Sequence, residues 1–283
     1  MTERNIALER ARQEIDEIDT KIHDLILRRT EVVADVGRAK GGTSTANFAP
    51  GREARVIRRR MDYHEGAFPR IAISRIWREM ISVYAALQGP YAVVAYTDGD
   101  EQSCWDLARD QYGCHDRMTA LSSIRGVIAQ VFSRDAAIGV VPVPTNDGST
   151  DCWWRSLCVA DAPQVVQRLP FVNGSNARNG AADAFAISRV LLDDSGDDRS
   201  LIVIETSEQM HQDNLRSLLA NAGLSAESVV SRHEDVWVHL ADVAGFVTPD
   251  GPELKRLESE DAILRACSIG GYAVLVGASE AEA

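Results

Sequence analysis

Apolar side chains recur every three or four residues along the first forty positions of the chain, where they fall at Ile15, Ile18, Ile22, Leu25, Val32 and Val36. No proline and a single glycine occur between Ala7 and Lys40, so the pattern predicts one long helix with an apolar stripe. A helix of about 34 residues is about 50 Å long. That exceeds what a ninety-residue globule can cover, so we expect the stripe to pack along another long helix, most simply that of a second copy of the chain.

The pattern then changes twice along the chain. A second helix is predicted from Arg52 and a third over 71–87, before the Gly89-Pro90 breaker and a buried strand at 91–96. The acidic run 192–198 is interpreted as a linker. Beyond it we predict a βαββαβ unit whose elements span 201–205, 212–222, 227–232, 236–243, 252–261 and 263–275.

Three cations interrupt or flank the apolar stripe of the first helix: Arg12, Arg29 and Lys40. Cations on a buried stripe are costly unless an anion meets them. Arg29 and Lys40 are eleven residues apart, so they lie within about 20° of each other on the helix and about 16 Å apart along it. Two such side chains could hold a small dianion between them. Arg12 is about 25 Å from Arg29 along the axis, so we expect it to serve the site of a partner chain.

The segments IDEIDTKIHDLILRRTEVVADVGRAK, PGREARV and IWREMISVYAALQ, taken in this order, resemble the all-helical class of chorismate mutase across residues 8–88. The resemblance implies that chorismate is the substrate and that the enzyme is a homodimer. It assigns catalytic positions to Arg29, Lys40 and Gln88, with Arg12 entering from the partner subunit. It assigns substrate-binding positions to Arg52, Glu53 and Tyr84. Tyr84 stands where many members carry a serine, and Ala49 where some carry an aspartate.

These residue types suit the reaction that the resemblance implies. The rearrangement of chorismate to prephenate is pericyclic, so it needs a fixed conformer and charge stabilisation rather than a nucleophile or a proton relay. Arg12 and Arg29 would bind the two carboxylates. Lys40 and Gln88 would donate to the ether oxygen, and Glu53 would take the ring hydroxyl. We accordingly expect neither a metal nor a cofactor.

The remainder of the chain resembles the two domains that follow this mutase in bifunctional enzymes. Residues 91–191 are similar to one lobe of prephenate dehydratase, but the Thr-Arg-Phe signature reads Asp183-Ala184-Phe185. Residues 199–283 are similar to an ACT domain with an altered effector region. The fold expected is therefore multidomain: an all-α three-helix domain at 1–90 in a dimeric bundle, an α/β single-lobe domain without dehydratase activity, and a ferredoxin-like βαββαβ domain.

Charge and composition narrow the function classes further. Residues 1–90 hold 16 basic and 13 acidic side chains, whereas residues 91–283 hold 14 and 29, and the formal net charge is −12. This balance argues against nucleic-acid binding, and the sequence contains no apolar run long enough for a membrane helix. Five cysteines without a metal-binding spacing predict free thiols in a reducing cytoplasm. Two alternatives to the mutase remain: a non-catalytic aromatic-metabolite sensor or interaction protein, and an isochorismate pyruvate lyase.

Overall fold

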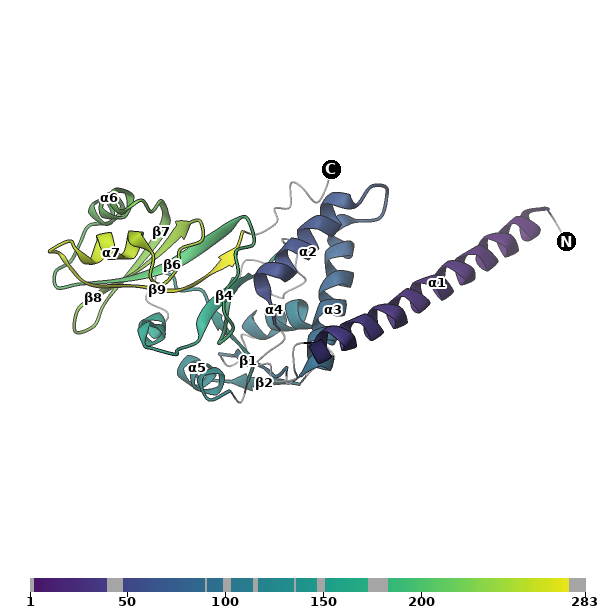
Figure 1. Ribbon diagram of the computed structural model, residues 1–283, viewed down its shortest axis with the longest axis horizontal. Helices are drawn as coiled ribbons and strands as arrows, with labels where there is room; N and C mark the ends of the chain where they lie inside the picture. Colours follow the sequence, from purple (N-terminus) through teal and green to yellow (C-terminus); the bar gives the residue numbers. More distant parts are fainter. Residues whose placement is uncertain are drawn as a thin grey trace.

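The computed structural model describes residues 3–39, 48–89, 91–98, 103–113, 117–134, 136–146, 151–172 and 183–274. Its first element is α1 (Glu3–Ala39), a helix of 37 residues that projects away from the rest of the molecule (Figure 1). None of its residues is buried, and the six apolar side chains of the predicted stripe are 38% to 69% exposed. The long helix is therefore confirmed, and within one chain its apolar stripe is uncovered.

Two shorter helices, α2 (Pro50–Tyr63) and α3 (Arg70–Gln88), lie side by side where α1 joins the body of the molecule (Figure 1). Pro50 occupies the first turn of α2, where its fixed φ and missing N–H cost nothing. The inner face of α2 is formed by Ala54, Ile57 and Met61, which belong to one buried cluster with Phe171 and Ala273 from the sheet region. The helical region thus packs against the α/β part of the chain.

Nine strands within the described residues form one sheet in the order β2-β1-β3-β5-β4-β9-β6-β8-β7. The first five are β1 (Val93–Tyr96), β2 (Met118–Leu121), β3 (Ile138–Pro142), β4 (Gln164–Leu169) and β5 (Ala184–Ser188). β1 is parallel to β2 and β3, whereas β5 is antiparallel to both β3 and β4. The helices of this half are α4 (Ser103–Tyr112), α5 (Ile124–Phe132) and the 3₁₀ helix η1 (Trp153–Cys158).

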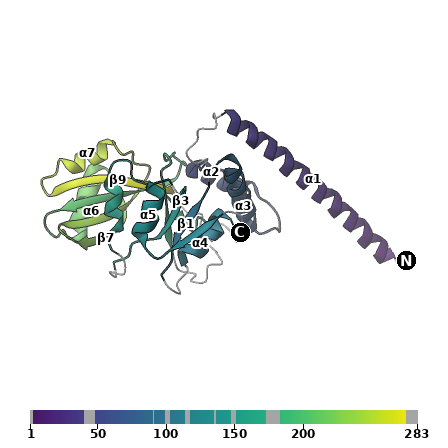
Figure 2. The same cartoon turned by 90° about the horizontal axis from the view of Figure 1, so that it is seen from below.

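The second half of the sheet has the βαββαβ order that the sequence predicted, and Figure 2 shows it at the end of the molecule farthest from α1. Its elements are β6 (Asp198–Thr206), α6 (Gln212–Ala222), β7 (Ala226–His233), β8 (Trp237–Ala244), α7 (Pro252–Glu258) and β9 (Ile263–Ala273). α6 has the predicted bounds, and Gly223 ends it in the left-handed region at φ 92°. The antiparallel order β9-β6-β8-β7 places both helices over one core.

The two halves of the sheet meet where β4 runs parallel to β9, with Val165 opposite Gly270. Gly270 has φ 110°, and a Cβ built there would lie 2.2 Å from the carbonyl oxygen of Val165. Only glycine permits both this conformation and this close approach of two backbones.

The expectation that all five cysteines are free thiols is wrong for two of them. A disulfide joins Cys158 at the end of η1 to Cys267 in β9, with 6.2 Å between their Cα atoms. The two residues are 109 positions apart, and folding brings their Cα atoms within the range that a disulfide spans. Cys104 and Cys152 are free and buried, and Cys114 lies outside the described residues.

Candidate active site

A cavity of about 160 Å³ lies between α1, α2 and α3, and five of the seven predicted site residues line it. α1 contributes Arg29, α2 contributes Arg52 and Glu53, and α3 contributes Tyr84 and Gln88. The remaining wall is formed by small or apolar side chains: Val33, Val36, Ala49, Val56, Ile81 and Ala85. Two guanidinium groups, a carboxyl group and an amide therefore share one small, largely apolar cavity.

Arg29 and Tyr84 form the contact between α1 and α3 within this cavity. The guanidinium carbon of Arg29 lies 4.2 Å from the centre of the Tyr84 ring, within reach of a cation–π interaction. The Tyr84 hydroxyl donates to the carbonyl oxygen of Ile26 at 3.0 Å and accepts from the Thr30 hydroxyl at 3.3 Å. The hydroxyl is thus bonded to α1, while the ring faces the guanidinium group.

Glu53 is the half-buried acid of the cavity. Burial raises the pKa of Glu53 from 4.5 to about 7, against a hydrogen bond with the backbone of Ala49 that lowers it, and the charge of Asp193 raises it further. Near neutral pH this carboxyl group therefore exists in both protonation states. It can accept a hydrogen bond from a ligand hydroxyl in one state and donate in the other.

The Gln88 amide is positioned by its own helix. Its Nε2 donates to the carbonyl oxygen of Tyr84 at 2.9 Å. Because an amide nitrogen carries two hydrogens, one remains for a ligand in the cavity. The side chain can therefore act as a neutral donor there.

Of the two remaining predicted residues, the structure describes Arg12 alone. Arg12 lies on the projecting part of α1, is 63% exposed and pairs with Glu9 at 2.8 Å. It does not line the cavity. Lys40 lies outside the described residues.

Sequence reasoning missed the acidic segment that binds the first two turns of α2. Residues 192–198, interpreted as a linker, contact its first two turns: Asp193 accepts a hydrogen bond from the Gly51 N–H at 3.1 Å and an ion pair from Arg55 at 2.7 Å. Four aspartates around one glycine are typical of a solvated connection, so no local signal distinguished this contact from a linker.

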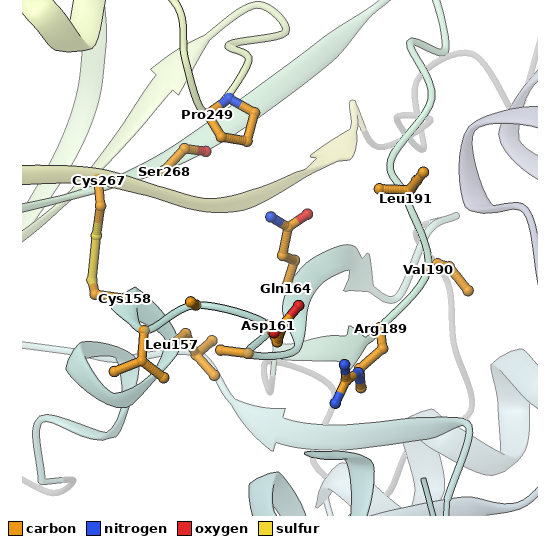
Figure 3. A pocket seen from close by; sticks show the side chains of 13 residues that line it. Leu157, Cys158, Asp161, Gln164, Arg189, Val190, Leu191, Pro249, Cys267 and Ser268 are labelled. Atoms are coloured by element: carbon orange, nitrogen blue, oxygen red, sulfur yellow. A yellow bond between two sulfur atoms is a disulfide. The ribbon is translucent and has the colours of Figure 1, made fainter. Parts of the chain in front are cut away.

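Another cavity, of about 410 Å³, lies at the junction of η1, β4 and β9 (Figure 3). The Cys158–Cys267 disulfide forms one wall, and Asp161, Gln164 and Ser268 provide polar groups. None of the predicted site residues lines it. Within the described residues, the predicted groups that share a cavity are therefore those between α1, α2 and α3.

No group of three or more His, Cys, Asp or Glu side chains in the described ranges of the chain is arranged to hold a metal ion. No helix within the same ranges is long and apolar enough to cross a membrane.

Comparison with known proteins bears on the helical region most directly. Residues 11–89 match the family model of chorismate mutase type II. These residues include Arg12, Arg29, Lys40, Arg52, Glu53, Tyr84 and Gln88. The matched segment therefore contains every predicted site residue.

Curated relatives match about half of this chain. A bifunctional chorismate mutase/prephenate dehydratase of Aquifex aeolicus is 31% identical over 140 residues, which are 48% of this chain and 38% of that protein. The enzyme of the same name from Pseudomonas aeruginosa is 30% identical over 144 residues, 49% of this chain and 39% of that protein. The matched part thus spans less than half the length of these relatives.

Among solved structures, a prephenate dehydratase from Arthrobacter aurescens in complex with L-Phe is similar over 64% of this chain and 90% of that chain. The TM-score is 0.46 at 11% identity.

Proposed function

We propose that this protein is a chorismate mutase that rearranges chorismate to prephenate in the synthesis of the aromatic amino acids. The observation that carries the proposal is the single cavity lined by Arg29, Arg52, Glu53 and Gln88, in a segment that matches the family model. A charged pocket with apolar walls meets the needs of a pericyclic reaction, which are a fixed conformer and stabilisation of the charge that develops on the ether oxygen.

Each side chain has a role in this proposal. Arg29 and Arg52 bind the carboxylates of the substrate, and the remaining amide hydrogen of Gln88 donates to the ether oxygen. Glu53 binds the ring hydroxyl. Lys40, which follows α1, supplies a second donor to the ether oxygen.

The proposal includes a homodimer, because the uncovered stripe of α1 needs an apolar partner. An α1 helix of a second copy supplies such a surface and brings in Arg12, whose position far along α1 supports a role in the partner's site. We place the enzyme in the cytoplasm.

We further propose that the α/β part is a dehydratase-like lobe without activity, followed by an ACT-like domain. Asp183 stands where the resemblance places the dehydratase threonine, and it forms an ion pair with Arg168 at 2.5 Å. A carboxylate bound in this way lacks the hydroxyl that the threonine would supply. The β9-β6-β8-β7 order supports an ACT-like domain.

The test is the conversion of chorismate by the purified full chain, followed as the loss of its absorbance, with acid conversion of the product to phenylpyruvate. Arg29→Ala should lower kcat/KM by about 10²-fold or more, because one charge-assisted donor to the substrate is lost. Arg28→Ala is the matched control, since Arg28 is exposed and pairs with Glu31 on the same helix.

Four results would contradict parts of the proposal. A folded wild-type chain that leaves chorismate intact would overturn the mutase function, and release of pyruvate from isochorismate by such a chain would favour a lyase. An equal loss in both arginine variants would remove Arg29 from the site. Phenylpyruvate formed from prephenate at neutral pH would overturn the inactive lobe.

A further inference from the structure

The segment 192–198, which connects β5 to β6, is bonded to the beginning of α2. One carboxylate oxygen of Asp193 accepts from the Gly51 N–H at 3.1 Å, and the other accepts from Arg55 Nη2 at 2.7 Å. The second terminal nitrogen of Arg55 donates to the carbonyl oxygen of Asp194. A single aspartate thus holds both a backbone donor and a side chain of the first turns of α2.

The next turn of α2 is held by the same region. Arg58 donates to the Ser195 hydroxyl at 3.0 Å, to the carbonyl oxygen of Asp197 at 2.9 Å and to that of Val274 at 2.7 Å. Val274 follows the end of β9. Because Gly51, Arg55 and Arg58 are spaced by four and three residues, these bonds occupy one face of α2 and oppose its rotation.

Gly51 permits the close approach of the two segments. A Cβ built at this position would lie 2.3 Å from the carbonyl oxygen of Asp193 and 2.6 Å from its carboxylate Oδ1. Any larger residue would displace either the helix or the segment. Arg52 and Glu53, the next two residues, are turned by about 100° and 200° from Gly51 and line the cavity.

We propose that Asp193 is a positioning residue of the mutase site: it fixes the first turn of α2 so that Arg52 and Glu53 face the cavity. The inference rests on the proposed function. It assigns a role to the α/β part of the chain, which holds one wall of a site made otherwise from helices.

The pKa of Glu53 provides a second readout of the contact with Asp193. Glu53 is faced by Asp193 from the segment, by Tyr112 from α4, and by the cavity cations Arg29 and Arg52. The negative charge of Asp193 raises the pKa of Glu53. Removing that charge should therefore move the Glu53 titration to lower pH.

The experiment compares Asp193→Ala and Asp193→Asn with Asp62→Asn in the full chain. Asp62 is an exposed aspartate near the other end of α2, paired with Arg70 at 3.6 Å, so it is a matched change of charge on the same helix. Asp193→Ala should lower kcat/KM for chorismate about 10- to 100-fold, because misplacing catalytic groups by about 1 Å has effects of that size. Asp62→Asn should stay within about twofold of wild type.

Two further measurements distinguish a positioning role of Asp193 from a role in folding alone. In Asp193→Asn, the pH limb that Glu53→Gln abolishes should shift to lower pH. In Asp193→Ala, hydrogen exchange across residues 48–57 should become about tenfold faster or more, because the Gly51 amide loses its acceptor. If Asp193→Ala does not fold, Asp193→Asn and Arg55→Ala take its place, since both weaken the contact and leave an oxygen at position 193 that can accept from the Gly51 N–H.

The outcomes for this inference and for the proposed function are distinct. Absence of turnover in the wild-type chain is a failure of the proposed function and is seen before any variant is compared. With an active wild type, unchanged exchange at α2 overturns the inference. Faster exchange with unchanged kcat/KM and an unmoved Glu53 limb also overturns it, because the contact would then be structural only.

Discussion

The helices α1 and α2 both supply arginines to one cavity, but the chain holds them in opposite ways. α2 has 14 residues, five of them buried, and is bonded along one face to residues 193–197 and Val274. α1 has 37 residues, none of them buried, and the Tyr84 hydroxyl is hydrogen-bonded to two of them, Ile26 and Thr30. One wall of the site is therefore built by folding of the single chain, whereas the other depends on whatever covers α1.

The largest expected effect comes from breaking the proposed contact between the α1 helices of two copies. Ile18→Glu places a charge on the apolar stripe, and burying an unpaired charge between two helices is strongly unfavourable. We expect the dimer to dissociate in sedimentation experiments at micromolar concentration, with turnover reduced about 10²-fold or more because Arg12 of the second copy is lost.

The control for that change is Leu27→Glu. Leu27 is 52% exposed and Ile18 47%, and their separation of nine positions places Leu27 half a turn away, on the opposite face of α1. This variant should remain dimeric and active. Equal masses for wild type and Ile18→Glu would refute the role of the stripe in assembly.

A smaller effect, on the free energy of unfolding, is expected from replacing one glycine in each helix. Gly51→Ala should lower the free energy of unfolding by about 1–3 kcal/mol, since its Cβ would meet backbone of the anchoring segment at 2.3 Å. Gly37→Ala in α1 should be neutral or stabilising by up to about 1 kcal/mol, because alanine favours helix and the nearest atom, Gln88 Cγ, is 3.5 Å away. Urea unfolding followed by circular dichroism measures both.

A result without this difference would contradict the contrast between the anchored helix α2 and the exposed helix α1. Equal changes in the free energy of unfolding for the two alanine variants would mean that the segment yields easily around Gly51. The contact between the segment 192–198 and α2 would then deform too easily to position a side chain.

The same contrast explains which parts of the structure were predictable from sequence. The existence of the long helix α1 and the bounds of α6 follow from apolar periodicity and a glycine cap, which are local signals, although α1 begins at Glu3, before the predicted Ala7. Five residues of the cavity could be predicted because the helical spacing and the family resemblance both lie within one segment of ninety residues. Such signals place a residue on a helix face without saying what lies opposite it.

Contacts between distant segments could not be predicted in this way. Asp193 meets Gly51 across 142 positions, and Cys158 meets Cys267 across 109. An acidic run with glycine is equally compatible with a solvated linker and with a segment that accepts bonds from arginines. Only the tertiary packing of α2 against the end of β9 decides between them.

The smallest expected effect concerns Tyr84, where α1 meets α3. Tyr84→Leu removes the ring 4.2 Å from the Arg29 guanidinium and the hydroxyl bonded to Ile26, so we expect kcat/KM to fall about tenfold. Tyr84→Phe keeps the ring and should fall about threefold. In an Arg29→Ala background the Tyr84→Leu change should have little further effect, because the ring acts through that guanidinium. A full tenfold loss in that background would show that Tyr84 contributes to the site independently of Arg29. The position of the Arg29 guanidinium group would then depend on the proposed second copy and not on Tyr84.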